Sequence, residues 1–132
     1  MNLIDHSFTG TKIIHGDMRD AHKHIGYEAC DVVAVNPPYR KEGSGDKSAK
    51  NESTRRARHE IDIDLAGVIA AAARLLKFGG RLYMIHQSQR IDDIFKYTRE
   101  NGIAVKTMQL IQPTPEKPPH LVLIEGQKFC LG

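Results

Sequence analysis

The sequence predicts one α/β domain with helices on both faces of a doubly wound sheet that ends in an antiparallel hairpin. Strand-like, β-branched runs alternate with helical periodicity along most of the 132 residues. The Val-rich run at 32–35 is apolar at every position, a pattern typical of a strand buried inside a parallel sheet. The last two strand-like segments follow each other without a helix between them, so they are expected to pair as a hairpin. The length and a hydrophobic content of 40% suit one domain, residues 1–132, with its own core.

The first part of the chain contains two predicted strands. The earlier one covers Lys12 to His15, and a helical turn from Asp20 to His24, capped by Asp20, follows it. The second strand covers Val32 to Val35 and stops at Asn36-Pro37-Pro38-Tyr39, because two successive prolines cannot continue a ladder. Ligands of open α/β sheets bind at the carboxyl ends of the strands, so this tetrapeptide marks a candidate site.

The later elements follow from helical spacing, glycine breakers and strand-like runs. The segment from Arg40 to Thr54 is long for a connection without periodicity, which favours a functional loop. The predicted elements after it are, in order, a helix from about Glu60 to Phe78 stopped by Gly79-Gly80, a strand at Arg81–His86, a helix at Ile91–Arg99, and strands at Ile103–Ile111 and Leu121–Phe129.

With these segments in view, the chain resembles the class I S-adenosylmethionine-dependent methyltransferases. More narrowly, it is similar to the bacterial tRNA(Val) adenine-N6 methyltransferases. Asn36-Pro37-Pro38-Tyr39 matches the signature of amino-methyltransferases, and Arg55 to Glu60 matches a basic stretch of the narrower family. Leu75 to Gly80 and Leu121 to Gly126 match its later core segments. The resemblance implies a Rossmann-like fold and S-adenosylmethionine as cofactor.

The chemistry of the tetrapeptide suits methylation of an exocyclic amine, whose lone pair is delocalised into the ring. A site for such an amine must accept both of its hydrogens. The Asn36 side chain and the Pro37 backbone offer two carbonyl oxygens within a frame stiffened by Pro38, and Tyr39 can stack on an extruded base. Methyl transfer then rests on positioning a reactive sulfonium.

The resemblance also implies which residues meet the cofactor. Asp17 matches the position whose carboxylate accepts from the adenine amine of the cofactor, with Met18 against that ring and Asn36 near the methyl donor.

The basic residues near the tetrapeptide are expected to contact phosphate groups of tRNA or another RNA, which predicts salt-dependent binding. They are Arg40, Lys41, Lys47, Lys50, Arg55, Arg56, Arg58 and His59. No DNA and no membrane partner is expected.

The family pattern is incomplete in this sequence. The opening strand, the glycine-rich turn that cradles the cofactor's methionine part and the acidic residue for its ribose are not found, so the chain resembles the C-terminal part of the domain. The first two family strands would then be missing, which leaves Val32 to Val35 as a sheet edge. Pairing of the first strand with that edge, or a homodimer through it, is expected.

Two other functions remain open. The same tetrapeptide serves methylation of a glutamine amide in proteins, and near variants serve guanine in ribosomal RNA. Alternatively, the chain is a catalytically silent module that binds RNA or itself.

Other residue types add little. His22 and His24 have no metal-ligand spacing, and His86, at a strand end, is expected to be structural or to support other site residues. The two cysteines suit reduced thiols in the cytoplasm.

Overall fold

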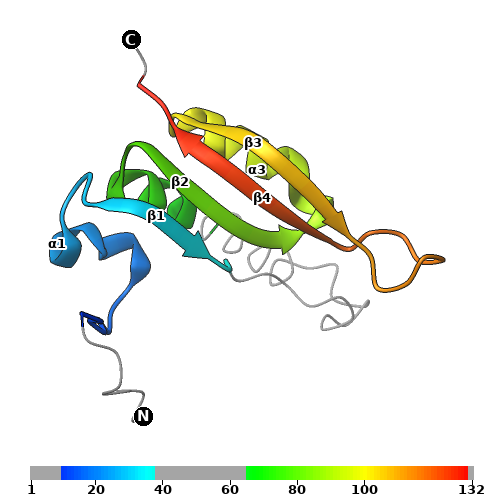
Figure 1. Ribbon diagram of the computed structural model, residues 1–132, viewed down its shortest axis with the longest axis horizontal. Coiled ribbons are helices and arrows are strands. Elements are labelled where there is room, and N and C mark those ends of the chain that lie inside the picture. The colour runs from blue at the N-terminus through cyan, green and yellow to red at the C-terminus, as the bar shows by residue number, and fades with distance from the viewer. Residues whose placement is uncertain (1–9, 38–64, 131–132) are drawn as a thin grey trace, which may run out of the picture.

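The computed structural model describes residues 10–37 and 65–130 and contains one four-stranded sheet (Figure 1). The strands are β1 (Cys30–Val35), β2 (Leu76–Gln87), β3 (Ile103–Ile111) and β4 (Leu121–Lys128), in the spatial order β1-β2-β4-β3. β1 and β2 are parallel, whereas β4 is antiparallel to both β2 and β3. The predicted α/β sheet with a closing hairpin is therefore confirmed.

The described helices cover one face of this sheet. Residues 65–75 are helical, and α3 (Ile91–Glu100) follows β2. Side chains from both helices join one cluster with alternate residues of β2 and β4; its members include Leu65, Ile69, Ile94, Leu82, Met84, Val122 and Ile124. On the opposite face Tyr83 and Leu123 remain 38% and 39% exposed. The expectation of helices on both faces is thus not met within the described ranges.

The predicted strand at Lys12–His15 is wrong, since these residues form no strand. Ile13 is 57% exposed and Ile14 37% exposed, and the outer edge of β1 is not paired with them. A strand is stable only with a hydrogen-bonded neighbour, and none of the described strands pairs with this segment. The proposed pairing of the first strand with the β1 edge therefore does not occur.

The turn that follows is also capped differently from the prediction. A short η1 (Met18–Asp20) precedes α1 (His22–Ile25), and the Asp17 side chain, rather than Asp20, accepts from the backbone N–H of Arg19. Asp20 instead pairs with Lys23 at 3.3 Å. The capping residue is therefore the one that the resemblance assigns to the cofactor.

The helix before β2 ends three residues earlier than predicted. β2 already begins at Leu76, which pairs with Cys30 before the register shifts to Val32 opposite Arg81. The shift is possible because Gly79 adopts φ +85°, where other residues are strained. A Cβ at Gly80 would lie 2.8 Å from the Lys77 carbonyl oxygen. The two glycines thus shape the start of β2 rather than a separate turn.

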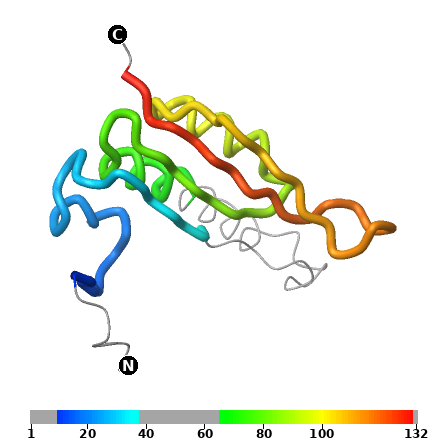
Figure 2. The backbone as a smooth tube through the Cα atoms, in the orientation of Figure 1, coloured from blue at the N-terminus to red at the C-terminus, as the bar shows by residue number. Residues whose placement is uncertain are grey.

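The remaining elements agree with the prediction to within a residue or two. The connection between β3 and β4, Gln112 to His120, projects past the end of the sheet (orange in Figure 2). The Gln112 side-chain amide stiffens it by donating to the carbonyls of Thr114, Pro115 and Lys117 at 3.0–3.2 Å.

In the part of the chain described, no helix has the length and apolar character needed to cross a membrane. Cys30 and Cys130 are both free thiols. The cytoplasmic location stays a prediction.

Candidate target-base site

The candidate site lies where the parallel strands β1 and β2 end side by side. Val35 of β1 is opposite Met84 of β2. Pro37 and His86 each follow two residues later along the chain. Asn36 is exposed, whereas the Pro37 side chain is among the fully buried ones. The strand alternation therefore presents the Asn36 amide at the sheet edge while anchoring the following residue in the interior.

His86 is the buried polar residue beneath this edge, with an exposed fraction of 0%. Burial lowers its pKa below the ordinary value, and the nearby charge of Arg90 acts in the same direction. The backbone of Pro37 has the opposite, weaker effect on this pKa. The imidazole is therefore held in its neutral form next to the predicted site.

The short η2 (Ser88–Arg90) fixes the segment just past His86. The Ser88 hydroxyl donates to the Pro119 carbonyl at 3.1 Å, and the Ser88 N–H donates to the His120 carbonyl at 3.0 Å. Arg90 donates to Asp93 of α3 at 2.7 Å. The carboxyl end of β2 is thus tied both to the hairpin connection and to the helix that follows.

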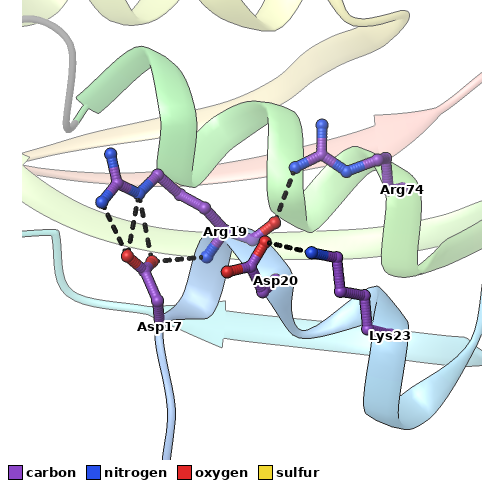
Figure 3. Close-up of polar contacts among 5 residues, drawn as sticks. All are labelled: Asp17, Arg19, Asp20, Lys23 and Arg74. Atoms are coloured by element: carbon purple, nitrogen blue, oxygen red, sulfur yellow. Dashed lines mark hydrogen bonds and ion pairs between the residues drawn. The ribbon is translucent and has the colours of Figure 1, made fainter.

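Asp17, the residue implied to bind the cofactor, is engaged by Arg19 (Figure 3). The Arg19 side chain donates to both carboxylate oxygens, with the shortest contact at 2.6 Å. These hydrogen bonds lower the pKa of Asp17 to about 2. Arg74 holds the same turn, because its guanidinium donates to the Arg19 carbonyl at 3.0 Å. A cofactor amine would have to share or displace these donors.

Met18, the second implied cofactor residue, is partly buried and packs against the hydrophobic core. The remaining predicted site residues lie outside the described ranges. They are Pro38, Tyr39, Arg40, Lys41, Lys47, Lys50, Arg55, Arg56, Arg58 and His59.

The sequence did not assign Arg19 or Arg90 to the site region. The only sequence signal for them is proximity, since Arg19 lies two residues after Asp17 and Arg90 four residues after His86. From the sequence alone, neither spacing shows that the arginine contacts the residue before it.

No protein-family model matches the chain. A tRNA1(Val) (adenine(37)-N6)-methyltransferase from Porphyromonas gingivalis is 29% identical over 115 residues, which are 86% of this chain and 44% of that protein. A protein of the same name from Vibrio cholerae is 29% identical over 94 residues, 71% of this chain and 38% of that protein. The chain thus spans less than half the length of these relatives.

Solved structures give the same fold. A candidate DNA modification methylase from Thermus thermophilus superposes with a TM-score of 0.62 at 19% identity, over 87% of this chain and 53% of that one. TrmN from Thermus thermophilus superposes with a TM-score of 0.59 at 14% identity, over 88% of this chain and 28% of that one. The chain thus has the fold of these methyltransferases.

Proposed function

We propose that this chain forms the target-base half of an S-adenosylmethionine-dependent methyltransferase domain that acts on N6 of adenine in tRNA. The observation that carries the proposal is the exposed Asn36 followed by the buried Pro37 at the carboxyl end of β1, beside the end of β2. The similarity to relatives named for adenine-N6 methylation of tRNA1(Val) supports the choice of substrate.

Two carbonyl oxygens of this site would hold the target amine. The Asn36 side-chain oxygen and the Pro37 backbone oxygen each accept one amine hydrogen, which favours a pyramidal nitrogen whose lone pair is less delocalised into the ring and is available to the methyl donor. Pro37 has no N–H, so nothing on its own backbone competes for those acceptors. Tyr39, outside the described residues, would stack on the flipped base. The proton leaves after the nitrogen has become cationic, so no strong base is needed.

The described residues fit the cofactor only in part. S-adenosylmethionine supplies the methyl group from its sulfonium. Asn36 would lie near that group and Met18 against the cofactor's adenine, while Asp17 would accept from the adenine amine by sharing a carboxylate oxygen with Arg19 or by displacing it.

The RNA interface of the proposal consists of the predicted basic residues between Arg40 and His59. Their phosphate contacts would make RNA binding weaken as salt rises. DNA and membranes are not part of this proposal.

The exposed edge of β1 favours a second candidate function, a catalytically silent module that associates with a second copy. Among the strands that the structure describes, β1 pairs with β2 alone, and Val32 in it is 55% exposed. An unprotected strand edge with apolar side chains is a site for pairing with another chain. Such a module would bind RNA or itself without binding the cofactor.

Calorimetry with S-adenosylmethionine, on a sample whose mass in solution has been determined, separates these two functions. The proposed function predicts measurable cofactor binding and transfer of a labelled methyl group to adenine of unmodified bulk tRNA. Asn36→Ala should abolish transfer, whereas Gln109→Ala, a change at an exposed residue of β3, should leave it unchanged.

A folded protein that does not bind the cofactor would overturn the proposed enzymatic function. The catalytically silent module would then be the remaining candidate. Methylation of a glutamine-containing peptide in preference to tRNA would instead favour protein as the substrate. Methylation of guanine in ribosomal RNA in preference to adenine in tRNA would favour the third alternative.

A further inference from the structure

Arg19 lies between the Asp17 carboxylate and the 65–75 helix, and it contacts both (Figure 3). On the helix side its aliphatic stem passes directly over Gly67, where a built Cβ would lie 3.0 Å from Cδ and 3.4 Å from Cγ of Arg19. Arg74 donates to the Arg19 backbone carbonyl at 3.0 Å. Gly67 and Arg74 are about two turns apart, so they share one face of the helix. This face therefore holds Arg19 both at its stem and at its backbone.

The glycine that makes room for Arg19 stands in a helix that is otherwise rich in alanine. Alanine occupies positions 66 and 70–73, and it favours a helix more than any other residue. A helical glycine instead lowers the folding equilibrium constant by about four- to fivefold relative to alanine. Because a Cβ at residue 67 would press on the Arg19 stem, the close approach of Arg19 accounts for a glycine at this position.

The other end of the Arg19 side chain orients the Asp17 carboxylate. Nε–H is shared between the two carboxylate oxygens at 3.1 and 3.2 Å, and Nη2 donates to Oδ2 at 2.6 Å. The Arg19 backbone N–H donates to Oδ1 at 2.9 Å. A carboxylate offers about four lone-pair positions, so these three donors leave about one for a ligand. Within the described residues the Asp17 side chain has no further hydrogen-bond partner, so Arg19 sets its orientation.

We propose that Arg19 is a positioning residue that sets the orientation of the Asp17 carboxylate relative to the 65–75 helix. This inference rests on the proposed function for its consequence, because Asp17 is expected to meet the adenine amine of the cofactor. The remaining lone pair of Asp17 would accept from that amine while Arg19 occupies the other positions. A change at residue 67 of the helix would then alter cofactor binding through Arg19.

A double-mutant cycle between residues 19 and 67 tests the contact, with urea unfolding of the full chain as the measurement. In Arg19→Ala the stem is gone, so Gly67→Ala should raise the folding equilibrium constant by about four- to fivefold in that background. In the chain that keeps Arg19, this gain should be absent or reversed, because the new Cβ presses on the stem. Lys23→Ala, which removes another cation of the same turn, is the control and should leave the effect of Gly67→Ala as it is in the unaltered chain.

Nuclear magnetic resonance of the Asp17 carboxyl carbon gives a readout that a loss of stability alone would not move. In Arg19→Ala the pKa of Asp17 should rise from about 2 toward its ordinary value of 3.8, because the hydrogen bonds from the Arg19 side chain are lost. At neutral pH this signal should also move in Gly67→Ala, although that change lies in the helix and not in the turn. It should stay in place in Lys23→Ala.

Calorimetry with S-adenosylmethionine connects the contact with the proposed function. Arg19→Ala should weaken binding about fivefold, because a hydrogen bond to a freely rotating carboxylate is less favourable than one to an oriented carboxylate. Gly67→Ala should change the affinity in the same direction. Unchanged or tighter binding by a folded Arg19→Ala variant would overturn the positioning role.

Equal effects of Gly67→Ala with and without Arg19 would also overturn the inference, as would an unmoved Asp17 signal in a folded Gly67→Ala variant. If the unaltered chain does not bind S-adenosylmethionine, the proposed function fails. The cycle and the Asp17 signal still decide in that case whether Arg19 orients Asp17.

Should Arg19→Ala not fold, Arg19→Lys gives the same decision, because lysine keeps an aliphatic stem but lacks the planar fork of donors. The Asp17 signal must then move in Arg19→Lys, while Gly67→Ala still brings no gain in that background. An Asp17 signal that stays in place in Arg19→Lys would contradict the inference.

Discussion

The ammonium group of Lys128, at the end of β4, donates to the carbonyl oxygen of Leu76 at 2.8 Å, where a helix passes directly into β2. It also donates to the Ala73 carbonyl at 2.6 Å and lies 4.8 Å from the centre of the Phe78 ring. One side chain thus satisfies carbonyls at the C-terminal end of the 65–75 helix, where a positive charge also complements the helix dipole.

Lys128→Met should therefore lower the free energy of unfolding by about 1–3 kcal/mol, since hydrogen bonds to charged groups are lost while the aliphatic stem is kept. Urea denaturation followed by circular dichroism measures this change. Lys106→Met, at an exposed position of β3, is the matched control and should have little effect. Equal effects of the two substitutions would show that the carbonyl contacts contribute nothing.

Gly126 of β4 lies directly against the side chain of Ile103 of β3. A Cβ built on it would lie 2.6 Å from Cγ2 of Ile103, a distance that real Cβ atoms do not show. Gly126→Ala is expected to cost about 1–3 kcal/mol of stability through overpacking. At Gly16 the nearest atom to a Cβ is 4.0 Å away, so Gly16→Ala should be nearly neutral in the same denaturation assay. A neutral Gly126→Ala would contradict the close packing.

Glu125, on the sheet face opposite the helices, is expected to make the stability of the fold depend on pH. Its carboxylate accepts from the Tyr83 hydroxyl at 2.8 Å and the Thr107 hydroxyl at 3.1 Å, and it pairs with Arg81 at 3.4 Å. The Tyr83 hydrogen bond, then that of Thr107, and lastly the Arg81 charge lower the pKa of Glu125 below its ordinary value of 4.5.

Because the folded pKa of Glu125 is the lower one, its stabilising effect is present above pH 4.5 and is lost as the pH falls through the folded value. Urea unfolding between pH 6 and pH 3 should show a smaller loss of stability in Glu125→Gln than in the unaltered chain. Glu100→Gln, an exposed change at the end of α3, serves as the control. An unaltered pH profile in Glu125→Gln would contradict the assignment.

Much of the sheet could be predicted from the sequence because the signals were local. The apolar run at Val32–Val35, the two prolines after it and the two closing strands each carry their own pattern. The prediction of a strand at Lys12–His15 was wrong because a strand needs a neighbouring strand, and the local sequence does not show whether one is present. The helix ends at residue 75 rather than at the predicted Phe78, because Gly79 and Gly80 lie within β2 and do not mark the end of the helix.

Asn36 and Pro37 are predicted as site residues from a pattern that is equally local, and their role stays a prediction. The full burial of His86 could not be predicted, because it depends on how β2 packs in the sheet. The engagement of Asp17 by Arg19 also needs the turn geometry of η1.

The edge of β1 is expected to mediate self-association. Val32→Lys places a charge on an exposed position of this edge and should shift the chain toward the monomer in sedimentation experiments, by opposing pairing with a second copy. Tyr27→Lys, at an exposed residue before β1, is the control for added charge. A monomeric unaltered chain at all concentrations would contradict the proposed homodimer.

The central claim is that Asn36 and Pro37 accept the amine of an unpaired adenine. The most direct test compares binding of two RNA hairpins that differ only in one loop base, adenine or hypoxanthine, by fluorescence anisotropy. Hypoxanthine replaces the amine with an oxygen, so both acceptors lose their donors at a cost of about 1–3 kcal/mol, or roughly five- to more than a hundredfold in affinity. We predict a clear preference for adenine in the unaltered chain and a much smaller preference in Asn36→Ala. Equal binding of the two hairpins by the unaltered, folded chain would contradict the account.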